Sequence, residues 1–499
     1  MNVLLIVPRY STKGGEFYQF PLGLGYIASA MRQAGHTVTG LNLNHYHGEV
    51  ESLVAEKVIE IDPDVCATGG LSPYLPVLKV IFAAARRAKP SILNIAGGGV
   101  VSGDPEACFE LIDIDVGVIG EAELTIVELL ECLGRSDNLS AINGIVFREN
   151  HGAVVRTPPR TPIKNLAEIA WPDYEVLGFE HHLAAQRVLD HHFFHTHPNS
   201  KPRAIDMVTS RSCPYSCTFC FHPVGKVYRE RPLDDFFHEL DALIARYDIN
   251  MVAIIDELFS LRKSRLLEFC ERIKPYNIQW MVQLHVICAD ENILTAMREA
   301  GCSYISYGIE SMSQPVLDSM KKKTTRKRIE AALCSTYEHK IGIQGNLIFG
   351  DTAETLETAN ETMHWWANNR RYQVYLSRLQ VFPGSPDYIK AVADGLITDR
   401  KYFLDTLPTY LNISGINEKN LEMLGLQIWV HGNTLFNLAP LHSFELSGDQ
   451  TPSRGPAYDI HWQCPRCKNN NAYLGSILRP DHGQTLRLFC RTCLSRWDI

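Results

Sequence analysis

The sequence predicts an α/β protein with two parallel-sheet domains, a helical extension and a small carboxy-terminal metal-binding module. Short apolar runs alternate with helical periodicity over residues 1–140 and again over 201–400, which is typical of parallel strands joined by crossover helices. Residues 456–499 contain four cysteines in two closely spaced pairs. A chain of 499 residues is also too long for a single hydrophobic core, because domains have about 100 to 200 residues.

The composition is that of an ordinary globular protein, and it excludes several functional classes. Hydrophobic residues make up 45% and charged residues 21%, which argues against disorder. The net charge of −8 offers no overall basic field, so nucleic acid is not expected as a partner. The first residues lack the pattern of a signal peptide, and no apolar run reaches the ~18 residues of a membrane-spanning helix. We therefore expect a cytoplasmic protein with no transmembrane segment, whose cysteines indicate metal sites.

The first domain, residues 1–140, is predicted to be a Rossmann-like sheet whose strands end in loops of small residues. Its apolar runs are each followed by a segment rich in glycine, serine or proline. Because open parallel sheets bind ligands at the carboxyl ends of their strands, we expect a ligand over these loops. The residues expected at this ligand site are Gly69, Gly70, Ser72, Gly97, Gly98, Gly99, Gly120 and Glu121.

The middle of the chain predicts three further parts. Residues 141–200 read as a hairpin, with its turn at 150–152, followed by a proline-rich linker. Over 201–400 the alternation of strand and helix resumes, and six strand-like runs predict a partial TIM-like barrel of six β/α units. Residues 401–455 carry apolar positions at helical spacing and predict a helical extension.

A loop with three cysteines follows the first strand of the predicted barrel. The stretch SRSCPYSCTFCF places Cys213, Cys217 and Cys220 at C-x3-C-x2-C spacing. Three thiolates bind three irons of a 4Fe-4S cubane and leave the fourth iron open. An open iron can be chelated by the amino and carboxylate groups of S-adenosylmethionine (SAM). A structural zinc site or a redox cysteine cluster is the alternative interpretation of this spacing.

This loop resembles the cluster-binding loop of the radical SAM superfamily. Phe219 stands where that superfamily usually has an aromatic residue, and Cys-Pro-Tyr at 213–215 is also similar. The segments DELF at 256–259, GIES at 308–311 and FGDTAET at 349–355 resemble the ends of later barrel strands. The resemblance implies that the cluster cleaves SAM reductively to a 5′-deoxyadenosyl radical. It implies SAM contacts from Phe219, Asp256, Glu257, Glu310 and Ser311.

The Rossmann-like domain ahead of the barrel resembles the cobalamin-dependent branch of the same superfamily, over about residues 1–400. The resemblance implies that cobalamin lies on the strand ends and that the glycine loops allow its close approach. A D-x-H-x-x-G motif after the first strand is missing, and His45 is interpreted as a surface loop residue. The resemblance implies methylation of an unactivated carbon. Radical cyclisation, carbon-carbon coupling or rearrangement, with or without cobalamin, is the first alternative, and a non-catalytic iron-sulfur scaffold or electron carrier is the second.

The carboxy-terminal module, residues 456–499, carries a second set of cysteines in the pairs Cys464-Pro-Arg-Cys467 and Cys490-Arg-Thr-Cys493. Two such pairs can form a tetrahedral four-thiolate site, and metal binding supplies the folding free energy that so short a segment lacks. The spacing resembles zinc ribbons and rubredoxins. Zinc would make the module structural, whereas iron would allow electron delivery, and the sequence favours neither metal decisively.

The sequence gives two further expectations about partners and one departure from the superfamily. A radical SAM enzyme needs a reducing partner such as flavodoxin or ferredoxin, and the substrate is an unidentified small molecule, lipid or peptide. His285 stands where many superfamily members have an arginine, so the sequence does not predict which residue contacts the SAM carboxylate at this position.

Overall fold

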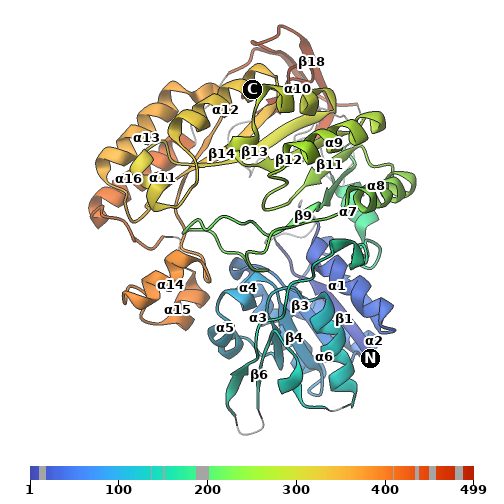
Figure 1. Ribbon diagram of the computed structural model, residues 1–499. Helices are drawn as coiled ribbons and strands as arrows, with labels where there is room; N and C mark the ends of the chain where they lie inside the picture. The colour runs from blue at the N-terminus through green and yellow to red at the C-terminus, as the bar shows by residue number, and fades with distance from the viewer. Residues whose placement is uncertain are drawn as a thin grey trace. The chain divides into compact units, whose positions relative to one another are not determined.

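A computed structural model describes most of the chain and divides it into two compact units (Figure 1). Unit 1 combines Met1–Ala185, Arg211–Asp235 and Gln380–Leu411; unit 2 combines Gln186–Ser210, Phe236–Leu379 and Asn412–Ile499. The loop with three cysteines therefore groups with the amino-terminal sheet, although it interrupts the predicted barrel. The described residues are 1–10, 18–135, 137–149, 152–186, 202–407, 410–432, 438–448, 457–477 and 487–498.

Unit 1 contains a seven-stranded sheet in the order β2-β1-β3-β4-β5-β6-β7. Strands β1 to β5 pair in parallel, and their order is that of flavodoxin-like doubly wound sheets. Strands β6 and β7 extend the edge as the expected antiparallel hairpin, although turn residues 150 and 151 lie outside the described residues. The strands are β1 (Asn2–Val7), β2 (Thr37–Asn42), β3 (Val65–Gly69), β4 (Leu93–Gly97), β5 (Val116–Val118), β6 (Ile145–Arg148) and β7 (Val154–Arg156).

Helices cover this sheet in pairs that share a face. Helix α1 packs beside α6, and α2 packs beside α3, as right-handed crossovers require. In α3 the residues Leu78, Ile81, Phe82 and Ala85 are buried at helical spacing, so one face of the helix seals the core. The helices of unit 1 are α1 (Leu22–Gln33), α2 (Val50–Ile61), α3 (Leu75–Ala88), α4 (Gly99–Gly103), α5 (Pro105–Leu111), α6 (Glu123–Arg135), α7 (Phe179–Ala185), α14 (Pro386–Ala393) and α15 (Arg400–Thr406).

Unit 2 contains a six-stranded sheet in the order β15-β14-β13-β12-β11-β8, in which every neighbouring pair is parallel. This confirms the six expected β/α units. The strands are β8 (Ala204–Met207), β11 (Met251–Ile254), β12 (Gln279–Leu284), β13 (Cys302–Glu310), β14 (Gly342–Phe349) and β15 (Tyr375–Arg378). The helices are α8 (Leu233–Tyr247), which begins in unit 1, α9 (Lys263–Ile273), α10 (Glu291–Glu299), α11 (Gln314–Ser319), α12 (Arg326–Glu338), α13 (Leu356–Asn368) and α16 (Glu418–Gly432).

The end of the chain forms two small antiparallel sheets in unit 2. Strands β16, β17 and β18 make one sheet, and β19 and β20 make the other. Strand β16 falls inside the predicted helical extension, so the prediction was wrong there; its residues pair with β17, which stabilises the extended form. The strands are β16 (Leu441–Leu446), β17 (Ala457–Gln463), β18 (Asn470–Ile477), β19 (Arg487–Phe489) and β20 (Arg496–Asp498). Among the described residues, no helix combines the length and apolarity needed to cross a membrane.

Candidate active site and metal centre

The three cysteines Cys213, Cys217 and Cys220 lie in an irregular loop of unit 1. Two short paired strands, β9 (Ser210–Arg211) and β10 (Arg229–Glu230), bracket the loop. Cys217 is buried, whereas Cys213 and Cys220 are half-buried. The donor set of three thiolates on one loop fits a 4Fe-4S cluster, because each thiolate can reach a separate iron and the fourth iron stays open.

The rest of this loop packs on glycine positions of unit 1. A Cβ atom added to Gly384 would lie 2.5 Å from Cε2 of Phe221, and one added to Gly99 would lie 3.6 Å from Cε1 of the same ring. The backbone N–H of Asp387 also donates to the carbonyl of Thr218 over 3.0 Å. The loop therefore rests against the region after β4 and against the start of α14, and Gly384 is needed for the close approach of the Phe221 ring.

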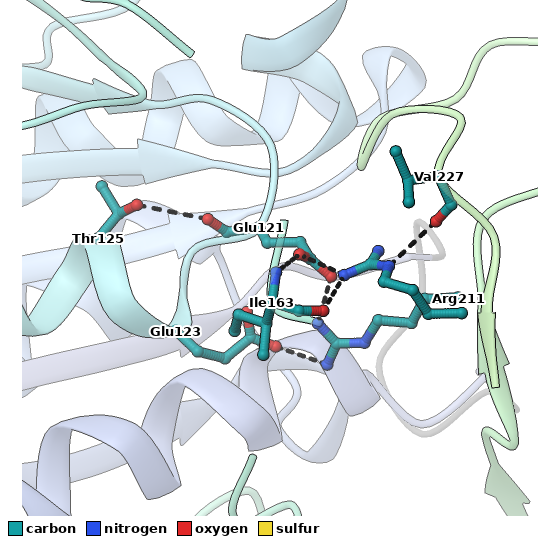
Figure 2. A network of polar contacts seen from close by, with 7 residues as sticks. Glu121, Glu123, Thr125, Ile163, Arg211 and Val227 are labelled. Atoms are coloured by element: carbon teal, nitrogen blue, oxygen red, sulfur yellow. Dashed lines mark hydrogen bonds and ion pairs between the residues drawn. The ribbon is translucent and has the colours of Figure 1, made fainter. Parts of the chain in front are cut away.

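Glu121, which follows β5, joins both ends of the cysteine loop (Figure 2). Its Oε1 atom accepts from Arg211 over 2.9 Å, and its Oε2 atom accepts from Arg229 over 2.8 Å. Oε2 also accepts from the backbone N–H of Ile163 over 3.0 Å, while Arg211 donates its second N–H to Glu123 over 2.6 Å. Burial alone would raise the pKa of Glu121, but Arg229 and Arg211 outweigh burial and lower that pKa. Glu121 is therefore charged and held by protein donors.

Several glycines predicted to admit a ligand are required by the packing of the protein itself. A Cβ atom on Gly69 would lie 2.5 Å from the carbonyl oxygen of Gly97, and one on Gly98 would lie 2.8 Å from that of Gly70. Gly98 also has a φ of +83°, which favours glycine. The loops after β3 and β4 thus contact each other through these glycines, and cobalamin contacts from them stay predictions.

The carboxyl end of β3 nevertheless offers groups that fit cobalamin. In a sheet of order 2-1-3-4-5 the ligand crevice opens where β1 and β3 diverge. Thr68 is buried there, and its Oγ1 atom has no hydrogen-bond partner among the described residues. Leu71, three residues further, exposes 53% of its surface although it is apolar. An unsatisfied hydroxyl at the end of β3 and an exposed apolar side chain three residues further fit a ligand with both amide groups and a hydrophobic face.

His45 is more enclosed than the sequence suggested. Its Nε2 atom lies 2.6 Å from the hydroxyl oxygen of Tyr18, and its ring stacks on His181 with the ring centres 4.1 Å apart. Burial and then the neighbouring His181 lower the pKa of His45 to about 4. The interpretation as a surface loop residue was therefore wrong, because the fold brings Tyr18 and His181 onto this short turn.

In unit 2, Asp256 ties together the carboxyl ends of β8 and β11. Its carboxylate accepts from the backbone N–H of Thr209 over 2.7 Å and from the Thr209 hydroxyl over 2.5 Å. Burial raises the pKa of Asp256 to about 7. Ser210 donates from its hydroxyl to the carbonyl of Leu258, which adds a second tie. Asp256 therefore holds the segment just before the cysteine loop, while its neighbour Glu257 is exposed.

Glu310 ends β13 in a strained conformation and carries an ion pair. Its φ is +66°, and one of its carboxylate oxygens lies 2.9 Å from Nζ of Lys322. Gly308 makes room for Lys322, since a Cβ there would lie 2.3 Å from Nζ. Burial, followed by the charge of Lys322 and then that of Arg328, lowers the pKa of His285 to about 4. The sequence alone did not single out Lys322, although the basic run at 321–323 could have suggested a partner for a buried carboxylate.

The predicted SAM contact Ser311 has protein partners, whereas one carboxylate oxygen of Asp351 has none among the described residues, the other accepting from the backbone N–H of Ala353 over 2.8 Å. The Ser311 hydroxyl lies 3.2 Å from Oγ1 of Thr362 on α13 and also accepts from the backbone N–H of Ser313. Asp351, just after β14, is fully buried, and its Oδ2 atom has no hydrogen-bond partner in the described parts of the chain. A buried unpaired acceptor fits the amino group of SAM. The SAM contacts of Phe219, Asp256, Glu257, Glu310 and Ser311 stay predictions.

The four carboxy-terminal cysteines form a compact metal centre. Their Sγ atoms all lie within 4.8 Å of one another, with Cys464 and Cys493 3.6 Å apart and Cys467 and Cys490 3.4 Å apart. A tetrahedral ion bound at about 2.3 Å places its sulfur ligands about 3.8 Å apart. The predicted four-cysteine site is confirmed as a group of ligands that fits one ion.

The metal centre is attached to the six-stranded sheet by residues beside the cysteines. Phe489, which precedes Cys490, is buried in one cluster with Ala204 and Met251, the first residues of β8 and β11. Arg466, between the first two cysteines, lies 3.8 Å over the ring of Tyr337.

Arg496, which follows the last cysteine, makes the most extensive of these attachments. It is 7% exposed and donates to the carbonyl oxygens of Ile343 and Gln373, to Oε1 of Gln373 and to the hydroxyl of Tyr375. Because each attachment comes from a residue within three positions of a cysteine, metal binding and docking depend on the same short segments.

Comparison with known proteins agrees with this architecture. The family model of the B12 binding domain matches residues 15–130, and that of the radical SAM superfamily matches residues 207–365. The chain is 28% identical over 394 residues to the uncharacterized methyltransferase PH0819 of Pyrococcus horikoshii, covering 77% of this chain and 81% of the relative. It is 27% identical over 375 residues to the anaerobic magnesium-protoporphyrin IX monomethyl ester cyclase of Rubrivivax gelatinosus, covering 72% of this chain and 65% of the relative.

Solved structures share the fold at lower identity. The radical SAM methyltransferase TsrM from Kitasatospora setae superposes with a TM-score of 0.65 at 20% identity, covering 79% of this chain and 76% of TsrM. The cobalamin-dependent radical SAM enzyme OxsB gives a TM-score of 0.62 at 16% identity, covering 87% of this chain and 62% of OxsB. With a B12-binding domain, a radical SAM domain and a three-cysteine loop in one chain, this protein belongs to the B12-binding radical SAM enzymes.

Proposed function

We propose that this protein is a cobalamin-dependent radical SAM methyltransferase that acts on an unactivated carbon. One observation carries the proposal: the cysteine loop and the B12-binding sheet belong to the same compact unit. Within that unit Phe221 packs near Gly99, and a Cβ on Gly120 would lie 3.9 Å from the carbonyl of Pro223. The loop for the radical-generating cofactor thus rests on the strand ends that would hold the methyl carrier.

The residues of the chain would divide the work of binding. Cys213, Cys217 and Cys220 would hold the cluster, and Thr68 would meet cobalamin at the carboxyl end of β3. When bound, the cluster supplies the electron that cleaves SAM, and cobalamin supplies the methyl group.

The experiment is product analysis with anaerobically reconstituted, cobalamin-loaded protein, SAM and a strong reductant. Methylation uses SAM in two ways, so we expect both 5′-deoxyadenosine and S-adenosylhomocysteine. Formation of 5′-deoxyadenosine without S-adenosylhomocysteine would contradict methyl transfer. It would favour the second candidate, radical cyclisation, which the similarity to the cyclase over 72% of this chain supports.

We further propose that zinc occupies the four-cysteine site and that the site is structural. Its four thiolates close the coordination shell. Phe489 docks at the first residues of β8 and β11, whereas the cysteine loop follows the carboxyl end of β8. Electrons would instead come from a partner such as flavodoxin or ferredoxin, and the substrate would be a small molecule, lipid or peptide. Elemental analysis showing one iron rather than one zinc in this site would contradict the structural assignment.

A further inference from the structure

The cysteine loop of unit 1 has an arginine at each end, and both arginines donate to the same carboxylate. Arg211 lies two residues before Cys213 and Arg229 lies nine residues after Cys220. Arg211 donates to Oε1 of Glu121 and Arg229 donates to Oε2 (Figure 2). Glu121 therefore bridges the beginning and the end of the loop, although it is about 90 residues away in sequence.

This bridge is enclosed by protein. The side chain of Glu121 is 5% exposed, that of Arg229 is 7% exposed and that of Arg211 is 12% exposed. Glu123, whose side chain is 9% exposed, accepts the other hydrogen bond that the Arg211 guanidinium donates. Two carboxylates thus balance two guanidinium groups in a region that water screens weakly. Loss of one partner would leave an uncompensated charge beside the cysteine loop.

Glu121 accepts hydrogen bonds from three donors in this network. Its two oxygens accept from Arg211, from Arg229 and from the backbone N–H of Ile163, and Arg229 also donates to the Ile163 carbonyl over 2.7 Å. Ile163 belongs to the segment after the β6–β7 hairpin, so a third part of unit 1 supports the carboxylate.

We propose that Glu121 is a positioning residue of the cluster loop: it fixes both ends of the loop and balances the charges of the arginines at those ends. The residue would act through Arg211 and Arg229 and need not touch SAM, cobalamin or the cluster. The proposal rests on the cluster role of the cysteines and is independent of methyl transfer. Because Glu121 follows β5 of the B12-binding sheet, the cluster loop is tied to that sheet by this carboxylate.

The test uses the full chain with its cluster reconstituted anaerobically, without cobalamin or substrate. The variant Glu121→Gln removes one negative charge while keeping the side-chain shape. We expect a midpoint potential of the cluster that shifts to a more positive value, and an altered electron paramagnetic resonance (EPR) spectrum of the reduced cluster. The variant Arg229→Gln removes a positive charge from the same bridge and should shift the potential in the opposite direction. A purely structural loss would not reverse sign between the two variants.

Two controls complete the experiment. Glu123→Gln removes a carboxylate that contacts Arg211 but not Arg229, so its shift should have the same sign as that of Glu121→Gln and be smaller. Glu128→Gln breaks an exposed ion pair with Arg160 outside the network and should leave the potential and spectrum unchanged.

Each outcome decides for or against the proposal. A wild-type spectrum and potential in Glu121→Gln would overturn it, as would shifts of equal sign in Glu121→Gln and Arg229→Gln. If Glu121→Gln does not fold, Arg229→Gln decides: a shift to a more negative potential supports the proposal, and an unchanged potential overturns it. In a separate titration with cobalamin, loss of cobalamin binding by Glu121→Gln together with an unchanged cluster would overturn the proposal and assign Glu121 to the cofactor. None of these readouts depends on the methylation product.

Discussion

The two cysteine sites of this protein are held in different ways. The loop site has three cysteines in irregular backbone, and two of them are half-buried. The carboxy-terminal site has four cysteines whose sulfur atoms already lie within 4.8 Å of one another. The ends of the loop are held by Glu121, a carboxylate from a distant segment, whereas the carboxy-terminal site is organised by its own two turns.

In our proposal this difference separates a reactive site from a structural one. A four-thiolate shell has no place for a further ligand, so its metal contributes folding free energy. Three thiolates leave an iron that SAM can bind, and the loop must then be positioned by other residues. In this protein the three-cysteine loop is positioned by a residue from another segment, whereas the four-cysteine site is positioned by its own two turns.

The largest expected effect comes from breaking the loop site. Cys217→Ala removes the buried cysteine of the loop, and a cubane with two thiolates is held too weakly to form an active cluster. We expect formation of 5′-deoxyadenosine to fall to background, measured by chromatography after incubation with SAM and reductant. Wild-type activity in this variant would contradict the assignment of the loop as the cluster site.

Loss of the metal from the carboxy-terminal site should lower the melting temperature of the protein rather than the activity of the loop site. Cys464→Ser disrupts the closed shell, and the docking of Phe489 and Arg496 should loosen with it. A loss of several kcal/mol corresponds to a decrease in the melting temperature of roughly 5 to 10 °C. Thermal unfolding with and without a chelator measures this effect. An unchanged melting temperature would contradict the structural role.

The variant Arg496→Met tests the docking of the metal centre on the six-stranded sheet separately from metal binding. The substitution keeps all four cysteines but leaves the carbonyl groups of Ile343 and Gln373 without their buried donor. We expect normal metal content and a loss of about 2 to 4 kcal/mol in unfolding free energy, measured by denaturant titration. Loss of the metal in this variant would show that docking is needed for metal binding.

The smallest effect concerns the pH dependence of stability at Asp256. Burial raises its folded-state pKa from 3.8 to about 7, so the folded protein binds this proton more tightly than the unfolded chain. The proton's contribution to stability is therefore full below pH 3.8 and is lost as the pH rises through about 7. Asp256→Asn should flatten the decrease in stability between about pH 4 and 7 in denaturant titrations. An identical slope in wild type and variant would contradict this account.

The sequence was sufficient for the order of the large elements because alternating strands and helices leave a strong pattern. It predicted the parallel sheets, the hairpin and both cysteine sites. It failed at β16, since the partner strand β17 stabilises an extended form that local periodicity does not reveal.

The contacts that hold the cysteine loop in place could not be predicted from the sequence. Glu121 and Asp256 were recognised as carboxylates at strand ends, but their partners Arg211, Arg229 and Thr209 come from distant segments. Only the fold shows that protein groups already occupy these carboxylates. Lys322 was missed for the same reason, because its contact with Glu310 requires β13 and the turn after α11 to meet.

The most direct test of the contrast between the two sites is an EPR spectrum of the anaerobically reconstituted, reduced protein before and after SAM is added. A cluster held by the three loop cysteines would have one iron without a protein ligand, so we predict that SAM changes the spectrum of wild-type protein and changes it equally in Cys464→Ser. No change on addition of SAM, or a change that disappears in Cys464→Ser while the loop cysteines are intact, would contradict the account.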